Sequence, residues 1–202
     1  MSTETSEHST PAVAIADPAP LGLVGFGMTT LALSFANAGI IKEAGGLSVI
    51  LGLAIFYGGI AQFVAGIWEF RRGNTFGATA FCSYGAFWLS FWWLNTHAIA
   101  GASPDIHQSL ALFLFSWALF TAYMSIAALR TTTATLAVFV ALTLTFIFLG
   151  IGALQNDLTG LASMTKVGGY IGIVTALLAF YASAALVINA THKKDLLPTL
   201  PR

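Results

Sequence analysis

Several long stretches of this chain contain no aspartate, glutamate, lysine or arginine. Each stretch can hold a helix of about 20 residues, the length that crosses the hydrocarbon core of a bilayer. Charged residues make up 8% of the sequence, whereas soluble domains contain about 25%. The charge-free stretches are residues 18–41, 44–68, 73–104, 106–129, 131–156 and 167–192. The sequence therefore predicts an all-α integral membrane protein with six transmembrane helices.

The ends of the expected helices follow from prolines and capping residues. Pro18 and Pro20 suit a first helical turn, because proline lacks the N–H that has no partner there. Asn74 and Thr75 are candidate N-caps of the third helix. We expect helices at about residues 20–41, 47–70, 75–98, 107–129, 133–154 and 167–190. They form a transmembrane domain of residues 18–192 between a polar N-terminal tail, 1–17, and a cytoplasmic C-terminal tail, 193–202.

The basic residues predict the orientation of the chain. Lysine and arginine are disfavoured in short loops that must be exported. Lys42 and Lys166 fall on one side of the membrane. The larger group on the other side consists of Arg71, Arg72, Arg130, Lys193, Lys194 and Arg202. We therefore expect both termini in the cytoplasm and the protein in the plasma (inner) membrane, and the net charge of zero gives no sign of a nucleic-acid partner.

The first helix carries polar residues that a purely lipid-facing helix does not need. In hydrocarbon each hydroxyl or amide needs a partner inside the protein, so such residues mark a helix interface or a solute path. Phe26, Thr30 and Asn37 share one face of this helix. Gln62 lies near the middle of the second helix, where interhelical hydrogen bonding explains it as well as a pore does. The candidate path residues are Thr29, Thr30, Ser34, Asn37, Gln62 and Ser83.

Motifs of known catalytic chemistry are missing from the sequence. It contains no GxSxG, HExxH or CxxC pattern, and Cys82 is the single cysteine. We therefore expect no enzymatic activity, no metal site and no cofactor. Glu69, close to Arg71 and Arg72, suits an interfacial ion pair better than a proton relay. These residues favour a transport protein, with an intramembrane enzyme or a non-transporting membrane scaffold as the alternative.

Motifs in the first half of the chain match one family closely. The signature NPAPLGL of that family stands here as Asp17-Pro18-Ala19-Pro20-Leu21-Gly22-Leu23, with aspartate in place of asparagine. Further matches are Gly25-Phe26-Gly27-Met28-Thr29-Thr30, Asn37-Ala38-Gly39, Tyr57-Gly58-Gly59-Ile60-Ala61-Gln62, Glu69-Phe70-Arg71, Gly73-Asn74-Thr75-Phe76-Gly77 and Ser83-Tyr84-Gly85. On these motifs the chain resembles the acetate uptake transporter family, also called succinate/acetate permeases or the YaaH family.

The resemblance implies both a function and a site. It implies a homohexamer of six-helix protomers, each with its own solute path, in the lipid bilayer. The path would carry acetate, and sometimes succinate or other short carboxylates, as a channel or coupled to protons. The resemblance also implies a narrow hydrophobic constriction formed by Phe26, Tyr84 and Leu142. The signature segment would lie at the cytoplasmic mouth, where Asp17 adds a negative charge.

Overall fold

The computed structural model describes residues 15–42, 44–98, 105–155 and 162–200. The regular elements within these residues are all helices, so the predicted all-α class is confirmed. The α-helices are α1 (Ala19–Asn37), α2 (Ala44–Leu53), α3 (Gln62–Arg72), α4 (Thr75–Trp93), α5 (Ile106–Ala128), α6 (Thr133–Leu154) and α7 (Ser163–His192). Two segments are π-helical, η1 (Ala54–Ala61) and η2 (Leu94–Ala98). Of the predicted tails, residues 1–14 and 201–202 lie outside the described residues.

Some of these elements follow one another without a break. The segments α2, η1 and α3 form one continuous rod, and η2 continues α4. Among the described residues, five helices are long and apolar enough to cross a membrane: Ala19–Asn37, Leu47–Arg72, Ile106–Ala128, Thr133–Leu154 and Ser163–His192. The helix α4 is not among them, since tryptophan, tyrosine, serine, threonine and glycine dilute its apolar residues. An integral membrane protein is therefore supported by five spans, and the sixth stays a prediction.

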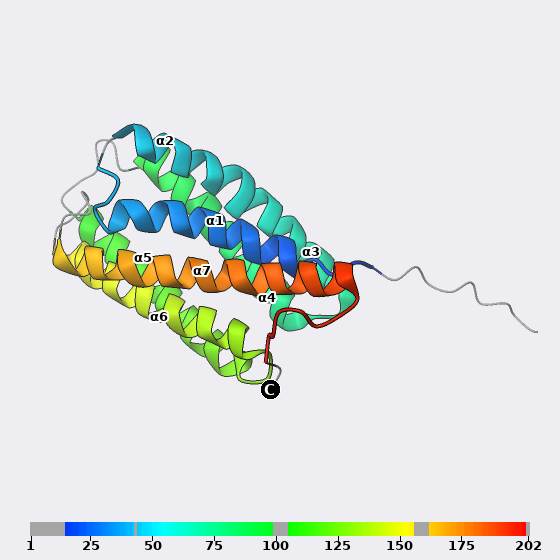
Figure 1. Cartoon of the computed structure of the whole chain (residues 1–202). Helices are drawn as coiled ribbons and strands as arrows, with labels where there is room; N and C mark the ends of the chain where they lie inside the picture. Colours follow the sequence, from blue (N-terminus) through cyan, green and yellow to red (C-terminus); the bar gives the residue numbers. More distant parts are fainter. Residues whose placement is uncertain (1–14, 43, 99–104, 156–161, 201–202) are drawn as a thin grey trace, which may run out of the picture.

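The helices pack side by side as an elongated bundle (Figure 1). Helix α1 lies along α7, α7 along α6, and α6 along α5, while the rod of η1 and α3 covers α1 and α4. The backbones of α4 and α5 scarcely approach each other. Large side chains therefore fill the space between these two helices. The first and last described residues lie at the same end of the bundle (Figure 1).

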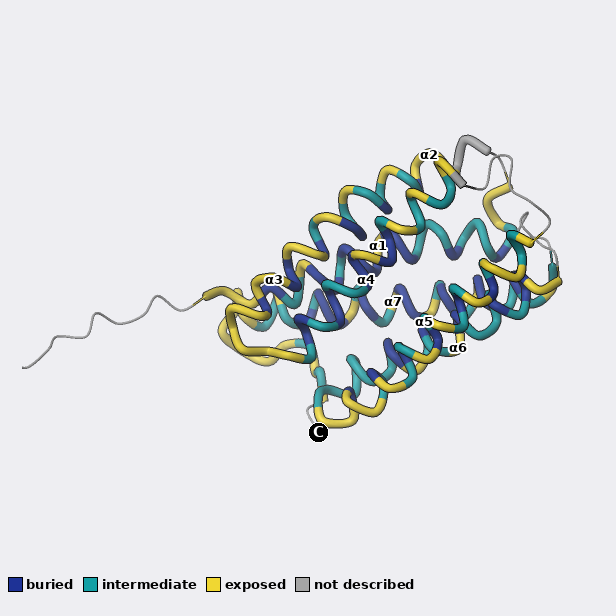
Figure 2. Tube along the Cα trace, turned by 180° about the vertical axis from the view of Figure 1, so that it is seen from behind, coloured by how far each residue is buried: buried dark blue, intermediate teal, exposed yellow. Residues whose placement is uncertain are grey.

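Many buried residues of the bundle are small, and many large apolar residues are exposed on its outer side. Ala54, Ala128 and Ala176 have no exposed surface, whereas Phe56 is 69% exposed and Leu119 72% exposed. Figure 2 shows the exposed residues on the outer sides of the helices and the buried ones on the inner sides. Small residues allow helix backbones to approach closely, and large apolar side chains suit contact with lipid. This distribution is typical of a membrane-embedded bundle.

Two glycines are required by the geometry at their positions. Gly73 ends α3 with φ +76°, a left-handed conformation that glycine adopts without a steric penalty. Asn74 then caps α4, because its side-chain oxygen accepts a hydrogen bond of 3.1 Å from the N–H of Gly77. Gly58 lies in η1, where a Cβ atom would come within 2.6 Å of the Thr29 hydroxyl oxygen. The absence of a side chain at Gly58 lets η1 lie directly on α1.

The C-terminal segment folds back over the end of the bundle (Figure 1). The side chain of Asn189 donates to the carbonyl of Leu197 and accepts from the N–H groups of Leu196 and Leu197, at 2.9 to 3.0 Å. The carbonyl of Leu200 accepts a 2.9 Å hydrogen bond from the N–H of Thr133. The segment thus ties the end of α7 to the start of α6.

Candidate functional site

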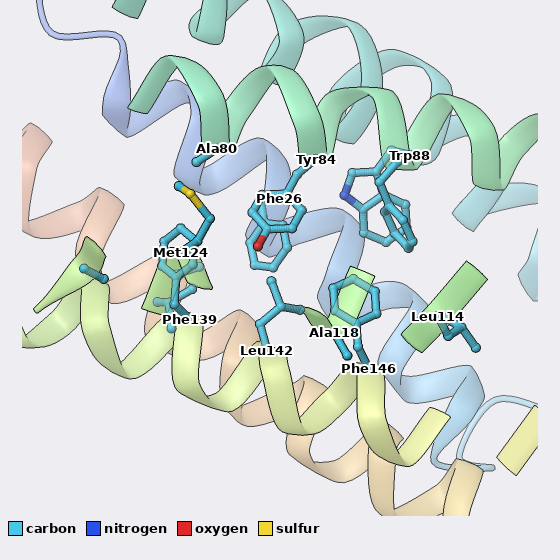
Figure 3. Packing of buried hydrophobic residues seen from close by; sticks show 14 of the residues in the cluster. Phe26, Ala80, Tyr84, Trp88, Leu114, Ala118, Met124, Phe139, Leu142 and Phe146 are labelled. Atoms are coloured by element: carbon cyan, nitrogen blue, oxygen red, sulfur yellow. The ribbon is translucent and has the colours of Figure 1, made fainter. Parts of the chain in front are cut away.

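A cluster of buried apolar side chains lies inside the bundle. Phe26 from α1, Tyr84 from α4 and Leu142 from α6 belong to one buried cluster, with exposed fractions of 5%, 3% and 3%. The ring centroids of Phe26 and Tyr84 are 5.7 Å apart. Leu142 points from α6 towards these two rings (Figure 3). The structure therefore brings together, from three helices, the residues that the resemblance assigns to a constriction.

Further aromatic rings surround Tyr84. The centroids of Trp117 and Phe120 on α5 lie 5.9 and 5.4 Å from its ring, and that of Phe139 on α6 lies 6.1 Å away. These rings fill the space between α4 and α5. They form an apolar layer around the Tyr84 ring.

Thr121 is a functional candidate that the sequence reasoning missed. Its hydroxyl oxygen lies 2.9 Å from the hydroxyl oxygen of Tyr84, and its side chain is completely buried. A signal was present, because Thr121 is a hydroxyl residue within the charge-free stretch 106–129. The matching motifs end before this stretch, so no motif marks this hydroxyl in the sequence.

Several buried polar side-chain atoms of the described residues have no hydrogen-bond partner. They include the hydroxyl of Thr30, both side-chain polar atoms of Gln62 and the indole nitrogen of Trp88. Thr30 follows Phe26 by one helical turn on α1, and the Cβ atom of Gln62 lies near Gly25. Leaving a buried polar group unpaired costs free energy, so native structures rarely do so without a reason. These groups keep hydrogen-bonding capacity that the described residues do not use.

The remaining candidate path residues have other surroundings. Thr29 donates its hydroxyl to the carbonyl of Gly25 at 2.9 Å and faces η1. Ser34 is buried where α1 packs against Gly172 of α7. Asn37 and Ser83 are half-buried. Asn37 ends α1 and therefore lies at the opposite end of that helix from Asp17.

The signature segment is a packing junction at the start of α1. Pro20 accepts a hydrogen bond of 2.7 Å through its carbonyl from the Ser183 hydroxyl of α7. Leu23 packs in a cluster with Phe81 of α4, and Gly22 lies against the same ring. The remaining members are the buried Pro18, the half-buried Ala19 and the exposed Leu21. The segment therefore joins the first helix to α4 and α7.

Ion pairs link this junction to the turn between α3 and α4. Arg72 pairs with Asp17, whose carboxylate also accepts a hydrogen bond of 3.0 Å from the N–H of Ala19. Glu69 is completely buried, accepts a 2.9 Å hydrogen bond from the Asn74 side chain, and lies 3.8 Å from Arg72. The structure thus shows the predicted pairing of Glu69 with Arg72, in which the carboxylate is buried and the arginine side chain is 34% exposed. The charge of Asp17 is balanced by Arg72.

An open pocket lies at the end of the bundle that holds both chain ends. Its volume is about 640 Å³, and its lining includes Asp17 and Pro20 of the signature segment together with Asn189, Lys193 and Lys194. The lining also includes Asp195, so two lysines face two aspartates in this pocket. In the part of the chain that the structure describes, histidine, cysteine and acidic residues form no group of three or more that could hold a metal ion.

Comparison with known proteins gives consistent matches over nearly the whole chain. A profile of the GPR1/FUN34/yaaH family matches residues 2–201. The succinate-acetate/proton symporter SatP of Escherichia coli (strain K12) is 39% identical over 185 residues, which cover 91% of this chain and 95% of that protein. Acetate permease A of Emericella nidulans is 37% identical over 195 residues, and the match spans 91% of this chain but 65% of the longer fungal protein.

A solved structure has the same fold. It is described as the bacterial acetate channel SatP, and it superposes with a TM-score of 0.83 at 38% sequence identity, covering 92% of this chain and 99% of that chain. Sequence and structure therefore agree on the same relatives. The chain belongs to the GPR1/FUN34/yaaH family.

Proposed function

We propose that this protein carries acetate and related short-chain carboxylates, including succinate, across the membrane along a path within each protomer. It is a transport protein and not an enzyme. The single observation that carries the proposal is the set of unpartnered buried donors from Thr30, one helical turn after Phe26 on α1, and from Gln62, whose Cβ atom lies near Gly25. The names of the symporter, permease and channel relatives support the same substrate class.

The chemistry of the solute explains why such donors are needed. Acetate is almost wholly ionised at neutral pH, because carboxylic acids of this kind titrate near pH 4 to 5. A carboxylate that enters an apolar region loses strong hydrogen bonds to water. In this proposal the Thr30 hydroxyl and the Gln62 amide replace part of that hydration. Thr29, Ser34, Asn37 and Ser83 are proposed to line the same path.

The orientation and the assembly belong to the proposal as well. We place both termini in the cytoplasm and the protein in the plasma membrane, because most basic residues gather at the end that holds the termini. The signature segment then forms the cytoplasmic mouth, where Lys193 and Lys194 line the pocket and Arg72 neutralises Asp17. The assembly is proposed to be a homohexamer, which native mass spectrometry in detergent tests directly.

Uptake of radiolabelled acetate into proteoliposomes tests the transport function. Uptake above that of protein-free liposomes is expected, with the difference measured over seconds because acetic acid itself crosses lipid. Equal uptake in both preparations would refute the proposal and favour a scaffold or an enzyme.

A second measurement separates a channel from a proton symporter. Acetate-driven current is recorded at fixed voltage while the proton gradient is varied. A current that follows only the acetate gradient and the voltage identifies a channel. A current that also depends on the proton gradient identifies coupling.

A further inference from the structure

We propose that Thr121 is a positioning residue that controls whether the Tyr84 hydroxyl can donate a hydrogen bond to a passing carboxylate. This inference rests on the proposed function and adds a residue of α5 to the site. Thr121 is completely buried, and Tyr84 is 3% exposed. The two hydroxyl oxygens lie 2.9 Å apart, so one of them donates to the other.

The direction of that hydrogen bond follows from counting protons. The hydroxyl of threonine has one proton to donate. In Thr121 it donates to the carbonyl of Trp117, at 2.7 Å, and this carbonyl can only accept. Thr121 must therefore accept at its second contact, which makes Tyr84 the donor. In this arrangement the phenolic proton points to α5 and is not available to an anion.

A second arrangement requires only the rotation of two hydroxyl groups. If Thr121 turns its proton from the Trp117 carbonyl to the oxygen of Tyr84, the phenolic proton becomes free. The ring of Tyr84 does not move in this exchange, since the distance of 2.9 Å allows either oxygen to donate. Thr121 thus permits two states of the constriction, one without a donor for an anion and one with a donor.

The surroundings of Tyr84 make this choice important for a carboxylate. Its ring neighbours are Phe26, Trp117, Phe120 and Phe139. Their ring faces carry partial negative charge and do not replace the hydration of an anion. A carboxylate at this level therefore gains from the Tyr84 hydroxyl, and it must compete with Thr121 for the phenolic proton.

Replacement of Thr121 by valine removes the competitor and keeps the shape of the side chain. The apparent KM for acetate in proteoliposomes is expected to fall about fivefold, the factor that one neutral hydrogen bond contributes to an equilibrium. Thr121→Ser retains the hydroxyl and is expected to restore the wild-type KM. Thr121→Cys offers a weak acceptor of similar size, is expected to lower KM as valine does, and serves if the valine variant does not fold.

A double-mutant cycle distinguishes a positioning role from a packing role. In a Tyr84→Phe background there is no phenolic proton to release, so Thr121→Val is expected to cause no further change in KM. Thr143→Val is the matched control, because Thr143 also donates to the carbonyl four residues earlier, at 2.9 Å, but has Ser125 as its second neighbour. No change in KM is expected for that variant.

The outcomes separate this inference from the proposed function. Wild-type flux together with an unchanged KM in Thr121→Val would overturn the role of Thr121 and leave the transport function intact. A shift of equal size in the Tyr84→Phe background would assign Thr121 to packing and would also overturn the inference. Absence of wild-type flux above protein-free liposomes would overturn the transport function and this inference together.

Discussion

Replacement of Leu142 by alanine is expected to widen the range of carboxylates that pass. Leu142 is 3% exposed, and its side chain points from α6 to the rings of Phe26 and Tyr84 (Figure 3). The substitution removes its isopropyl group from this contact. This leaves space beside the rings of Phe26 and Tyr84. The polar side chains of Thr30 on α1 and Gln62 on α3 keep their positions.

The magnitude follows from the cost of fitting a larger solute into a tight apolar site. One additional methylene or methyl group in such a site changes discrimination by about 1–3 kcal/mol, or about 10- to 200-fold. Lactate carries a methyl and a hydroxyl group more than acetate. We therefore expect the ratio of lactate to acetate flux to rise by at least about tenfold. The same change removes packing contacts, so the free energy of unfolding is expected to fall by about 2–5 kcal/mol.

The assay compares initial uptake of labelled lactate and acetate into proteoliposomes that contain equal amounts of folded protein. Leu144→Ala is the matched control, since Leu144 lies on the same helix and is 43% exposed. Leu142→Val is a smaller truncation for use if the alanine variant is unstable. A folded Leu142→Ala variant with an unchanged flux ratio would remove Leu142 from the constriction.

Three further changes test the packing. Gly58→Ala places a Cβ atom within 2.6 Å of the Thr29 hydroxyl oxygen. We therefore expect the free energy of unfolding to fall by about 1–3 kcal/mol and the melting temperature in detergent to be lower. Gly52→Ala meets open space, and an equal drop in this control would refute the explanation. Asn189→Ala removes the hydrogen bonds that hold the C-terminal segment, and amide exchange there is expected to accelerate about fivefold; unchanged exchange would contradict this. Asn74→Ala removes the cap of α4, so the free energy of unfolding is expected to fall by about 1 kcal/mol. An unchanged melting temperature would argue against this capping role.

Much of the fold could be predicted because its signals are local. Charge-free stretches indicate spanning helices whatever their neighbours are. The capping role of Asn74 also follows from the residues around it, and the structure confirms it. The composition of α4 weakens the signal for a span, since its tryptophans, hydroxyls and glycines are less apolar than the residues of the other helices.

The parts that could not be predicted depend on contacts between distant residues. Arg72 neutralises Asp17 across 55 positions of the chain, so the sequence alone shows only an additional negative charge. The hydrogen bond between Tyr84 and Thr121 joins two helices whose backbones scarcely approach each other. The π-helical turns also escape prediction, because the residues of η1 suit an α-helix equally well and only packing against α1 and α4 distinguishes the two.

The π-helical segment η1 determines how α3 is rotated about the helix axis relative to α2. A π-turn accommodates more residues than an α-turn, and each residue added to or removed from a helix rotates everything that follows by about 100°. Deletion of one residue between Ala54 and Ala61 would therefore turn Gln62 and Glu69 out of the interior and carry neighbouring apolar side chains in. In this stretch the number of residues matters as well as their identity, and a shortened chain would keep its hydropathy while losing the polar groups inside the bundle.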